Sequence, residues 1–255
     1  MLKVEDLGDV RVLRLTRPPV NALNQALLEE LTAVIWEAPA AGARGLVLTG
    51  EADCYCAGLD VRALIACDAA MLTDFLGAFL DCLQALAAST VPVVAAINGH
   101  SPAGGAVLAL HCDWRVMRDG ETRIGLNEVA VGLCPGPLIQ AVLTQTVGPR
   151  VAARLLTSGA LVNAAEALSI GLVDELAPAD EVHEVALRWL RSRLDLPSYA
   201  YQTTRRMVRA DLVALLDEVT GPGRRAALDA LQRDWLHPET RTTLEALLLR
   251  RASGR

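Results

Sequence analysis

The opening of the chain alternates apolar and polar residues, and apolar runs follow it. Residues 2–16 alternate around Gly8-Asp9, which predicts a β-hairpin that ends at Pro18-Pro19. Residues 45–49 form a short apolar run, typical of a strand in a parallel sheet that is covered on both faces. Residues 93–96 and 114–117 predict two further strands.

Helical periodicity separates these strands and then dominates the chain. Five apolar residues share one helix face between Asn24, a candidate N-cap, and about Trp36: Leu27, Leu28, Leu31, Val34 and Ile35. A helix is also predicted over 71–88. Alternating strands and helices indicate an α/β fold with a mostly parallel sheet.

Beyond Gly136 the pattern is almost entirely helical. Strand character survives only near Leu172-Val173. We therefore expect an α/β core over residues 1–195 and a C-terminal helical region over 196–255. The predicted helices span 137–146, 149–157, 164–169, 179–194, 197–218, 223–235 and 239–251.

Composition narrows the class of protein. With 255 residues, 52% of them hydrophobic, and a net charge of −6, the chain is predicted to be globular and not to bind nucleic acid. No uncharged stretch reaches about 20 residues, so no membrane span is expected. The six cysteines have neither a disulfide-scaffold density nor a zinc spacing, and no secretory signal is visible, so we expect reduced thiols and a cytoplasmic location.

Several enzyme classes lack their motifs here. The sequence contains no GxGxxG after a strand, no GxxxxGK[ST], no HExxH and no GxSxG, and its four histidines have no ligand spacing, so no metal site is predicted. What remains is two glycine turns, AGLD (57–60) and AGGA (103–106), and an isolated acid, Glu128, in an apolar stretch.

Such turns can build an oxyanion hole. Glycine permits backbone geometry that points an adjacent N–H into a cleft, and the amides of a first helical turn are unpaired. Two amides converging on one carbonyl oxygen would stabilise an oxyanion, with Glu128 as a base opposite them. The plain alternatives stay open at this point: glycines that only allow close packing, and a glutamate that is solvated or paired.

The order of several motifs resembles the crotonase, or enoyl-CoA hydratase/isomerase, superfamily over nearly the whole chain. The nearest likeness is to mitochondrial-type Δ3,Δ2-enoyl-CoA isomerases. The matching segments are PPVNALN (18–24), CAGLD (56–60), INGHSPAGG (97–105), CDWRVM (112–117), IGLNEVAVGL (124–133) and EALSIGLVDEL (166–176). The resemblance implies the crotonase-like spiral of ββα units.

The resemblance also implies roles for individual residues. The backbone N–H groups of Leu59 and Gly104 would hold the thioester carbonyl of an acyl-CoA, and Glu128 would be the catalytic base. Hydratases of this superfamily use a second glutamate, and its position is Val107 here, which favours double-bond isomerisation over water addition. Residues implied to contact the substrate are Val20, Ala22, Leu23, Ala57, Gly58, Asp60, Val61 and Asn127, although Asp60 could simply cap a helix.

The expected reaction moves a proton within one substrate. Glu128 would take the C2 proton of a 3-enoyl-CoA and return it to C4, which requires no cofactor, since coenzyme A belongs to the substrate. The resemblance also implies that the chain assembles into a homotrimer or hexamer. Hydration, thioester hydrolysis, decarboxylation and non-catalytic acyl-CoA binding stay open as alternatives. Candidate partners for the CoA phosphates, each of which could instead be a solvated cation, are Arg14, Arg17, Arg62, Arg205, Arg206 and Arg209.

Overall fold

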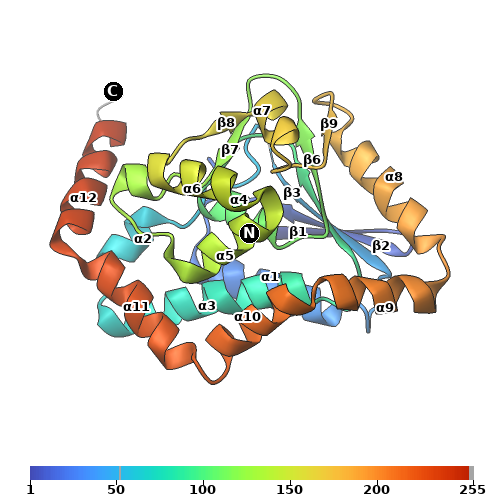
Figure 1. Ribbon diagram of the computed structural model, residues 1–255, viewed down its shortest axis with the longest axis horizontal. Helices are drawn as coiled ribbons and strands as arrows, with labels where there is room; N and C mark the ends of the chain where they lie inside the picture. The colour runs from blue at the N-terminus through green and yellow to red at the C-terminus, as the bar shows by residue number, and fades with distance from the viewer. Residues whose placement is uncertain (52, 253–255) are drawn as a thin grey trace.

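The centre of the protein is a six-stranded sheet. The structure is a computed structural model that describes residues 1–51 and 53–252. The strand order is β1-β2-β3-β4-β6-β9; β1 is antiparallel to β2, and all other neighbours are parallel (Figure 1). The strands are β1 (Leu2–Leu7), β2 (Val10–Leu15), β3 (Gly45–Gly50), β4 (Val93–Ile97), β6 (Trp114–Arg118) and β9 (Glu175–Ala177).

A second sheet consists of three short strands. β5 (Ser101–Pro102) pairs in parallel with β7 (Arg123–Gly125), and β7 pairs antiparallel with β8 (Val162–Asn163). None of these was predicted, because two or three residues carry no periodicity. This sheet ties the segment after β4 to the segment that leads to Glu128.

Helices cover both faces of the main sheet. α8 (Val182–Leu194) packs on one face and α1 (Gln25–Glu37) and α3 (Ala69–Ala88) lie beyond the other (Figure 1). The remaining helices are α2 (Val61–Ala66), α4 (Gly104–Leu110), the 3₁₀ turn η1 (Val129–Val131), α5 (Gly136–Val147), α6 (Pro149–Ser158), α7 (Ala164–Ser169), α9 (Ser198–Val208), α10 (Ala210–Thr220), α11 (Arg224–Leu236) and α12 (Pro238–Ala252).

The apolar run of β3 explains why two cores form. Leu46 and Leu48 point into the large core with α1 and α3, whereas Val47 points into the smaller core beneath α8. Successive residues of a strand face opposite sides, so a strand between two helical layers must be apolar throughout. The α/β class, the hairpin and the side-chain N-cap of Asn24 on α1 are confirmed.

The structure shifts one secondary-structure prediction by a few residues and corrects another. Leu172 and Val173 are buried in a turn, and the strand follows them at β9. The helix predicted over 197–218 is two helices, α9 and α10, which break at Arg209. Its guanidinium is held by the carbonyls of Ala87 and His111, so tertiary contacts override the helical pattern.

α3 has the length and composition of a membrane-crossing helix. It is nevertheless a core helix, since it packs against α1, α10 and α11, and 61% of its apolar window is buried inside the protein. The chain beyond residue 195 is helical as far as the structure describes it, and the division into units 1–195 and 196–255 stays a prediction.

Candidate active site

The amide of Leu59 is aimed by a bridge between two loops. Leu23 N donates to Gly58 O at 2.8 Å, and Asp60 N donates to Leu23 O at 2.8 Å. In a trans peptide the N–H points opposite to the carbonyl. Because Gly58 O faces Leu23, the Leu59 N–H must face the other way. Gly58 itself has φ +88°, a conformation that L side chains rarely adopt.

The amide of Gly104 is aimed by a strained residue. Ala103 has φ 48° and ψ −123°, which is unusual for a residue with a Cβ and costs about 1–3 kcal/mol. Two hydrogen bonds hold it there: Ala103 N donates to Gly125 O at 2.8 Å, and Ala103 O accepts from Val107 N at 3.0 Å. The Gly104 N–H therefore points out of the first turn of α4. Nothing in the sequence signals this strain.

The two amides lie side by side. A Cβ built on Gly104 would lie 3.2 Å from Leu59 N, and one built on Gly58 would lie 2.9 Å from Gly104 N. One built on Gly105 would lie 2.1 Å from Cys56 O, so the second glycine is required by packing. Within the described part of the chain, neither Leu59 N nor Gly104 N has a hydrogen-bond partner. Both amides can therefore donate hydrogen bonds to a single oxyanion.

Glu128 follows β7 at the start of η1. It lies three residues after Gly125, whose carbonyl holds Ala103. Its Oε2 is buried and finds no partner among the described residues. Burial raises the pKa of Glu128 to about 7, against a smaller lowering by its own backbone amide. A carboxyl group with this pKa can exchange a proton near neutral pH.

The apolar wall around Glu128 is only partly the one expected from the sequence. Ile124 and Leu126 are buried, but Val131 is half-buried and Val129 is 47% exposed. Val129 packs near Gly159 of the turn after α6, outside the core. Val107 is 2% exposed, and its apolar side chain adds no second acid there.

The predicted substrate-contact residues differ in their exposure and in their contacts. The Leu23 side chain is fully buried in the core and Gly58 is buried, so they shape the site from behind. Asp60 caps α2 and pairs with Arg17. Four residues keep accessible surface beside the amides or the loops that carry them, namely Val20, Ala22, Ala57 and Val61. Asn127 is half-buried, and its Oδ1 has no partner in the described chain.

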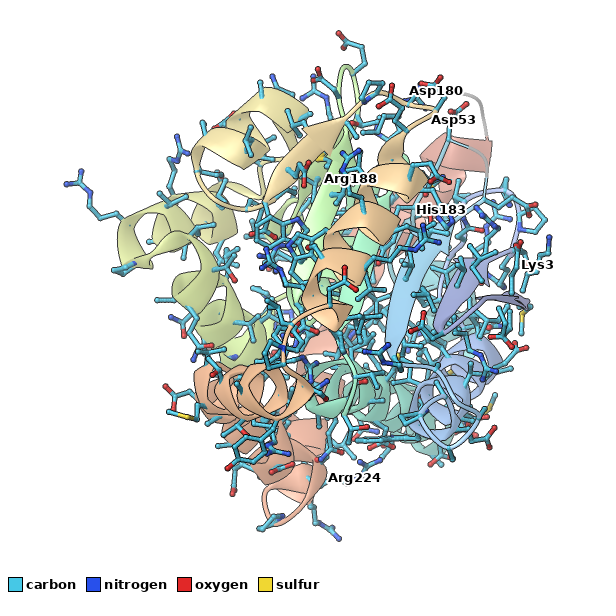
Figure 2. All side chains as sticks on the ribbon, turned by 90° about the vertical axis from the view of Figure 1, so that its right-hand side faces the viewer. Lys3, Asp53, Asp180, His183, Arg188 and Arg224 are labelled. Atoms are coloured by element: carbon cyan, nitrogen blue, oxygen red, sulfur yellow. The ribbon has the colours of Figure 1, made fainter. Side chains whose placement is uncertain are left out.

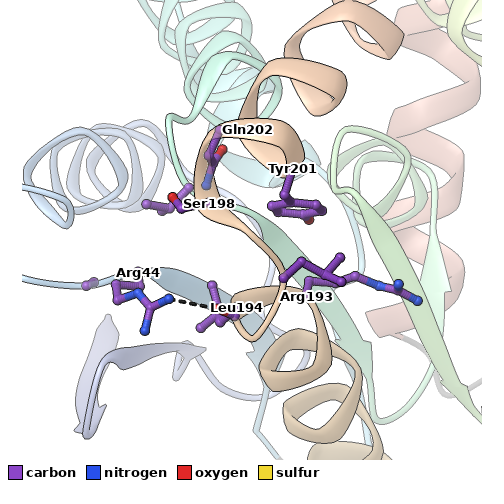
Figure 3. A pocket seen from close by; sticks show the side chains of 9 residues that line it. Arg44, Arg193, Leu194, Ser198, Tyr201 and Gln202 are labelled. Carbon is purple, nitrogen blue, oxygen red and sulfur yellow. Dashed lines mark hydrogen bonds between the residues drawn. The ribbon is translucent and has the colours of Figure 1, made fainter.

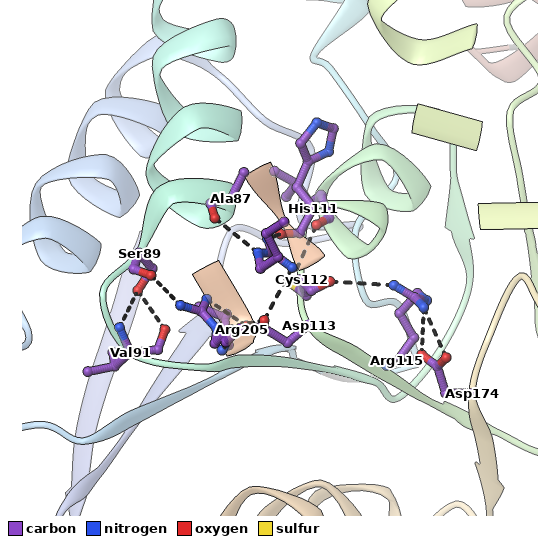
Figure 4. Close-up of polar contacts among 12 residues, drawn as sticks. Ala87, Ser89, Val91, His111, Cys112, Asp113, Arg115, Asp174 and Arg205 are labelled. Carbon is purple, nitrogen blue, oxygen red and sulfur yellow. Dashed lines mark hydrogen bonds and ion pairs between the residues drawn. The ribbon is translucent and has the colours of Figure 1, made fainter. Parts of the chain in front are cut away.

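Two of the arginines proposed to bind the CoA phosphates form contacts within the protein instead. Arg205 and Arg209 both bind Asp113, and their side chains are 5% and 11% exposed (Figure 4). Arg205 also donates to Ser89 O, after the end of α3, and Arg209 to His111 O, at the end of α4. Carbonyls at helix C-termini lack partners within the helix and attract cations. Both arginines therefore fasten α9 to the core. Arg14 donates to Gly50 O, while Arg62 and Arg206 are exposed.

The buried thiols offer no nucleophile. Burial raises the pKa of Cys56, Cys82 and Cys112 to about 12, so each stays protonated at neutral pH. In residues 1–51 and 53–252, no group of three or more His, Cys, Asp or Glu side chains is placed to hold a metal ion.

Two described cavities lie away from Leu59, Gly104 and Glu128. One of about 190 Å³ lies between α8 and α9, beside Arg44 and Tyr201 (Figure 3). The other, of about 610 Å³, lies between α1, α3 and α11 beside Arg224, at the opposite end of the molecule from Asp53 of the 50–60 loop (Figure 2).

α12 packs on its own chain across both sides of the site. Thr240 Oγ1 donates to Gly132 O at 2.6 Å, next to η1, and Arg241 donates to Ile65 O of α2 at 3.2 Å.

Comparisons with known proteins identify relatives of this chain. The family model described as "Enoyl-CoA hydratase/isomerase" matches residues 6–226. The chain is 36% identical over 212 residues to "Enoyl-CoA delta isomerase 1, mitochondrial" of Mus musculus, covering 82% of this chain and 73% of that protein. It is 35% identical over 193 residues to "Probable enoyl-CoA hydratase echA17" of Mycobacterium avium, covering 74% of each.

A solved structure confirms the crotonase fold. The "Crystal structure of human mitochondrial delta3-delta2-enoyl-CoA isomerase" superposes with a TM-score of 0.93 at 31% identity, over 100% of this chain and 99% of that one. The resemblance read from the motifs is thereby confirmed. A match over most of the chain, to the family model and to this fold alike, means that the chain belongs to the enoyl-CoA hydratase/isomerase family.

Proposed function

We propose that the protein is a Δ3,Δ2-enoyl-CoA isomerase of fatty-acid β-oxidation. The observation that carries this proposal is Glu128, a single carboxyl group with a buried, unpartnered oxygen and a pKa raised to about 7, three residues after Gly125, whose carbonyl holds Ala103. Val107 stands where a hydratase would have its second acid. One acid can move a proton between two carbons, whereas water addition calls for a second acid, which the valine at position 107 cannot supply.

The mechanism uses few groups. The Leu59 and Gly104 amides polarise the thioester carbonyl and make the C2 proton acidic. Glu128 takes that proton, the electrons delocalise through the C3–C4 double bond as a dienolate, and the same acid delivers the proton to C4. The product is the conjugated 2-trans-enoyl-CoA. We further propose that the enzyme acts in the cytoplasm as a homotrimer or hexamer.

Parallel assays test the reaction. The purified enzyme should convert 3-hexenoyl-CoA to 2-trans-hexenoyl-CoA, and hydrate 2-trans-hexenoyl-CoA much more slowly. Product identification by chromatography separates the outcomes. Faster hydration would assign a hydratase, release of free CoA a thioesterase, and binding without turnover of either substrate a non-catalytic acyl-CoA binder.

The pH profile of the isomerisation should report Glu128. The base is active as a carboxylate, and burial raises its pKa to about 7. We therefore expect log(kcat/KM) to rise with unit slope below about pH 7 and to level off above it. Initial rates of 3-hexenoyl-CoA conversion between pH 5 and 9 measure this. A flat profile down to pH 5 would mean that the base has an ordinary carboxyl pKa.

A further inference from the structure

Arg17 links the two loops whose bridge aims the Leu59 amide. One guanidinium nitrogen donates to Ala22 O at 2.9 Å, and another donates to Asp60 Oδ2 at 2.5 Å. Both side chains of the ion pair are largely buried, with 26% of Arg17 and 15% of Asp60 exposed. The backbone amide of Arg17 extends the link, since Arg17 N donates to Asn21 Oδ1 at 3.0 Å.

The two atoms that Arg17 binds flank the bridge that aims the amide. Ala22 precedes Leu23 on one loop, and Asp60 follows Leu59 on the other. The remaining oxygen of Asp60, Oδ1, accepts from the first amides of α2, Arg62 N and Ala63 N. The carboxylate is therefore fixed on both sides, and the guanidinium closes the end of a bridge that is only one residue pair long.

We propose that Arg17 is a positioning residue for the oxyanion hole, and that it holds the Leu59 N–H in register with Gly104 by clamping Ala22 to Asp60. This inference rests on the proposed function. The clamp matters because a single isolated bridge has little rigidity of its own, while an oxyanion hole loses rate steeply when a donor shifts. The planar fork of arginine can bind a carboxylate and a carbonyl together, which a lysine ammonium does less well.

The chain contains a matched control. Arg44 also binds one carboxylate and one carbonyl, Asp9 Oδ2 at 2.9 Å and Leu194 O at 2.8 Å, but its side chain is 54% exposed and it lies outside the bridge. A general effect of losing such an arginine would appear in both Arg17→Met and Arg44→Met. A positioning effect would appear only in Arg17→Met.

The kinetic test uses two substrates: 3-hexenoyl-CoA, and the same acyl group on N-acetylcysteamine, which has no phosphates. Arg17→Met should lower kcat about 10- to 100-fold on both, with little change in KM, and Arg17→Lys should recover part of the loss. Arg44→Met should match the wild type. A rise in KM confined to the CoA substrate would identify Arg17 as a phosphate ligand and overturn the proposal.

Asp60→Asn supplies a second route if Arg17→Met fails to fold. Asparagine keeps the helix cap but removes the charge that Arg17 binds. It should reproduce the loss in kcat. Where Arg17→Met also folds, the double variant should be no worse than either single one, because both changes remove the same contact. Additive losses in the double variant would contradict the clamp.

Hydrogen exchange gives a readout that needs no turnover. In Arg17→Met, but not in Arg44→Met, the amides of Ala57 and Asp60 should exchange faster, since both are bonded to the 20–23 loop that Arg17 secures. Unchanged exchange together with unchanged kcat would refute the clamp. If the wild type turns over neither substrate, the proposed isomerase function fails, and the exchange result still decides whether Arg17 holds this loop.

Discussion

Replacing Glu128 with Gln should lower kcat for 3-hexenoyl-CoA isomerisation by about 10²- to 10⁴-fold, the range of a general base. The amide keeps the size and polarity of the side chain but cannot accept and return a proton. Glu128 Oε2 has no hydrogen-bond partner among the described residues. Formation of the conjugated thioester, followed by absorbance, measures the rate.

Glu121→Gln provides the control. Glu121 is an exposed glutamate in the turn before β7, on the same segment of chain, and this change should leave kcat unaltered. Retained activity in Glu128→Gln would remove Glu128 from the role of base. Loss in both variants would point to a disturbed segment instead of a missing proton acceptor.

Stability should move in the opposite direction to activity. The pKa of Glu128 is raised from 4.5 to about 7 in the folded protein, so folding favours the protonated form. Below pH 4.5 this group costs nothing; as pH rises to 7 and beyond, the buried charge destabilises the fold, by up to about 3 kcal/mol. Glu128→Gln should therefore unfold at a higher temperature than the wild type at pH 8, which thermal melts can check.

Local signals in the sequence predicted much of the fold. The hairpin turn at Gly8-Asp9, the N-cap Asn24 and the apolar run of β3 each specify structure within a few residues. Predictions failed where distant contacts decide. Leu172 and Val173 are apolar because they are buried, not because they pair in a strand. Arg209 ends α9 because its side chain reaches the ends of α3 and α4.

In the candidate site, too, local motifs predicted some features, and distant contacts determine the others. The pairing of the Leu59 and Gly104 amides was expected from the motifs that carry the family resemblance, and the structure brings these amides together. The strain at Ala103 and the clamp of Arg17 on Asp60 were not predicted, because they depend on contacts with Gly125 and Ala22 that no local pattern encodes. Asp60 illustrates the limit: its capping role was foreseen, but not its ion pair.

Replacing Gly104 with Ala should lower kcat by about 10²- to 10³-fold, as expected when an oxyanion-hole donor is lost. The φ of Gly104 lies outside the left-handed region, so alanine fits the backbone. Its methyl group, however, would lie 3.0 Å from Gly58 Cα and 3.2 Å from Leu59 N, so it would crowd the position of the carbonyl oxygen and push the two amides apart.

Gly77→Ala separates this effect from a general cost of adding a methyl group. Gly77 lies within α3, where a Cβ would meet only the guanidinium group of Arg224, which pairs with Asp81 and would have to shift. That change should preserve kcat, because the shift affects the contact between α3 and α11 and not the two amides. Steady-state kinetics of both variants measure the difference. The methyl group in Gly104→Ala touches the amides and not Glu128. Unimpaired turnover in this variant would therefore mean that Leu59 N and Gly104 N do not hold the reacting carbonyl.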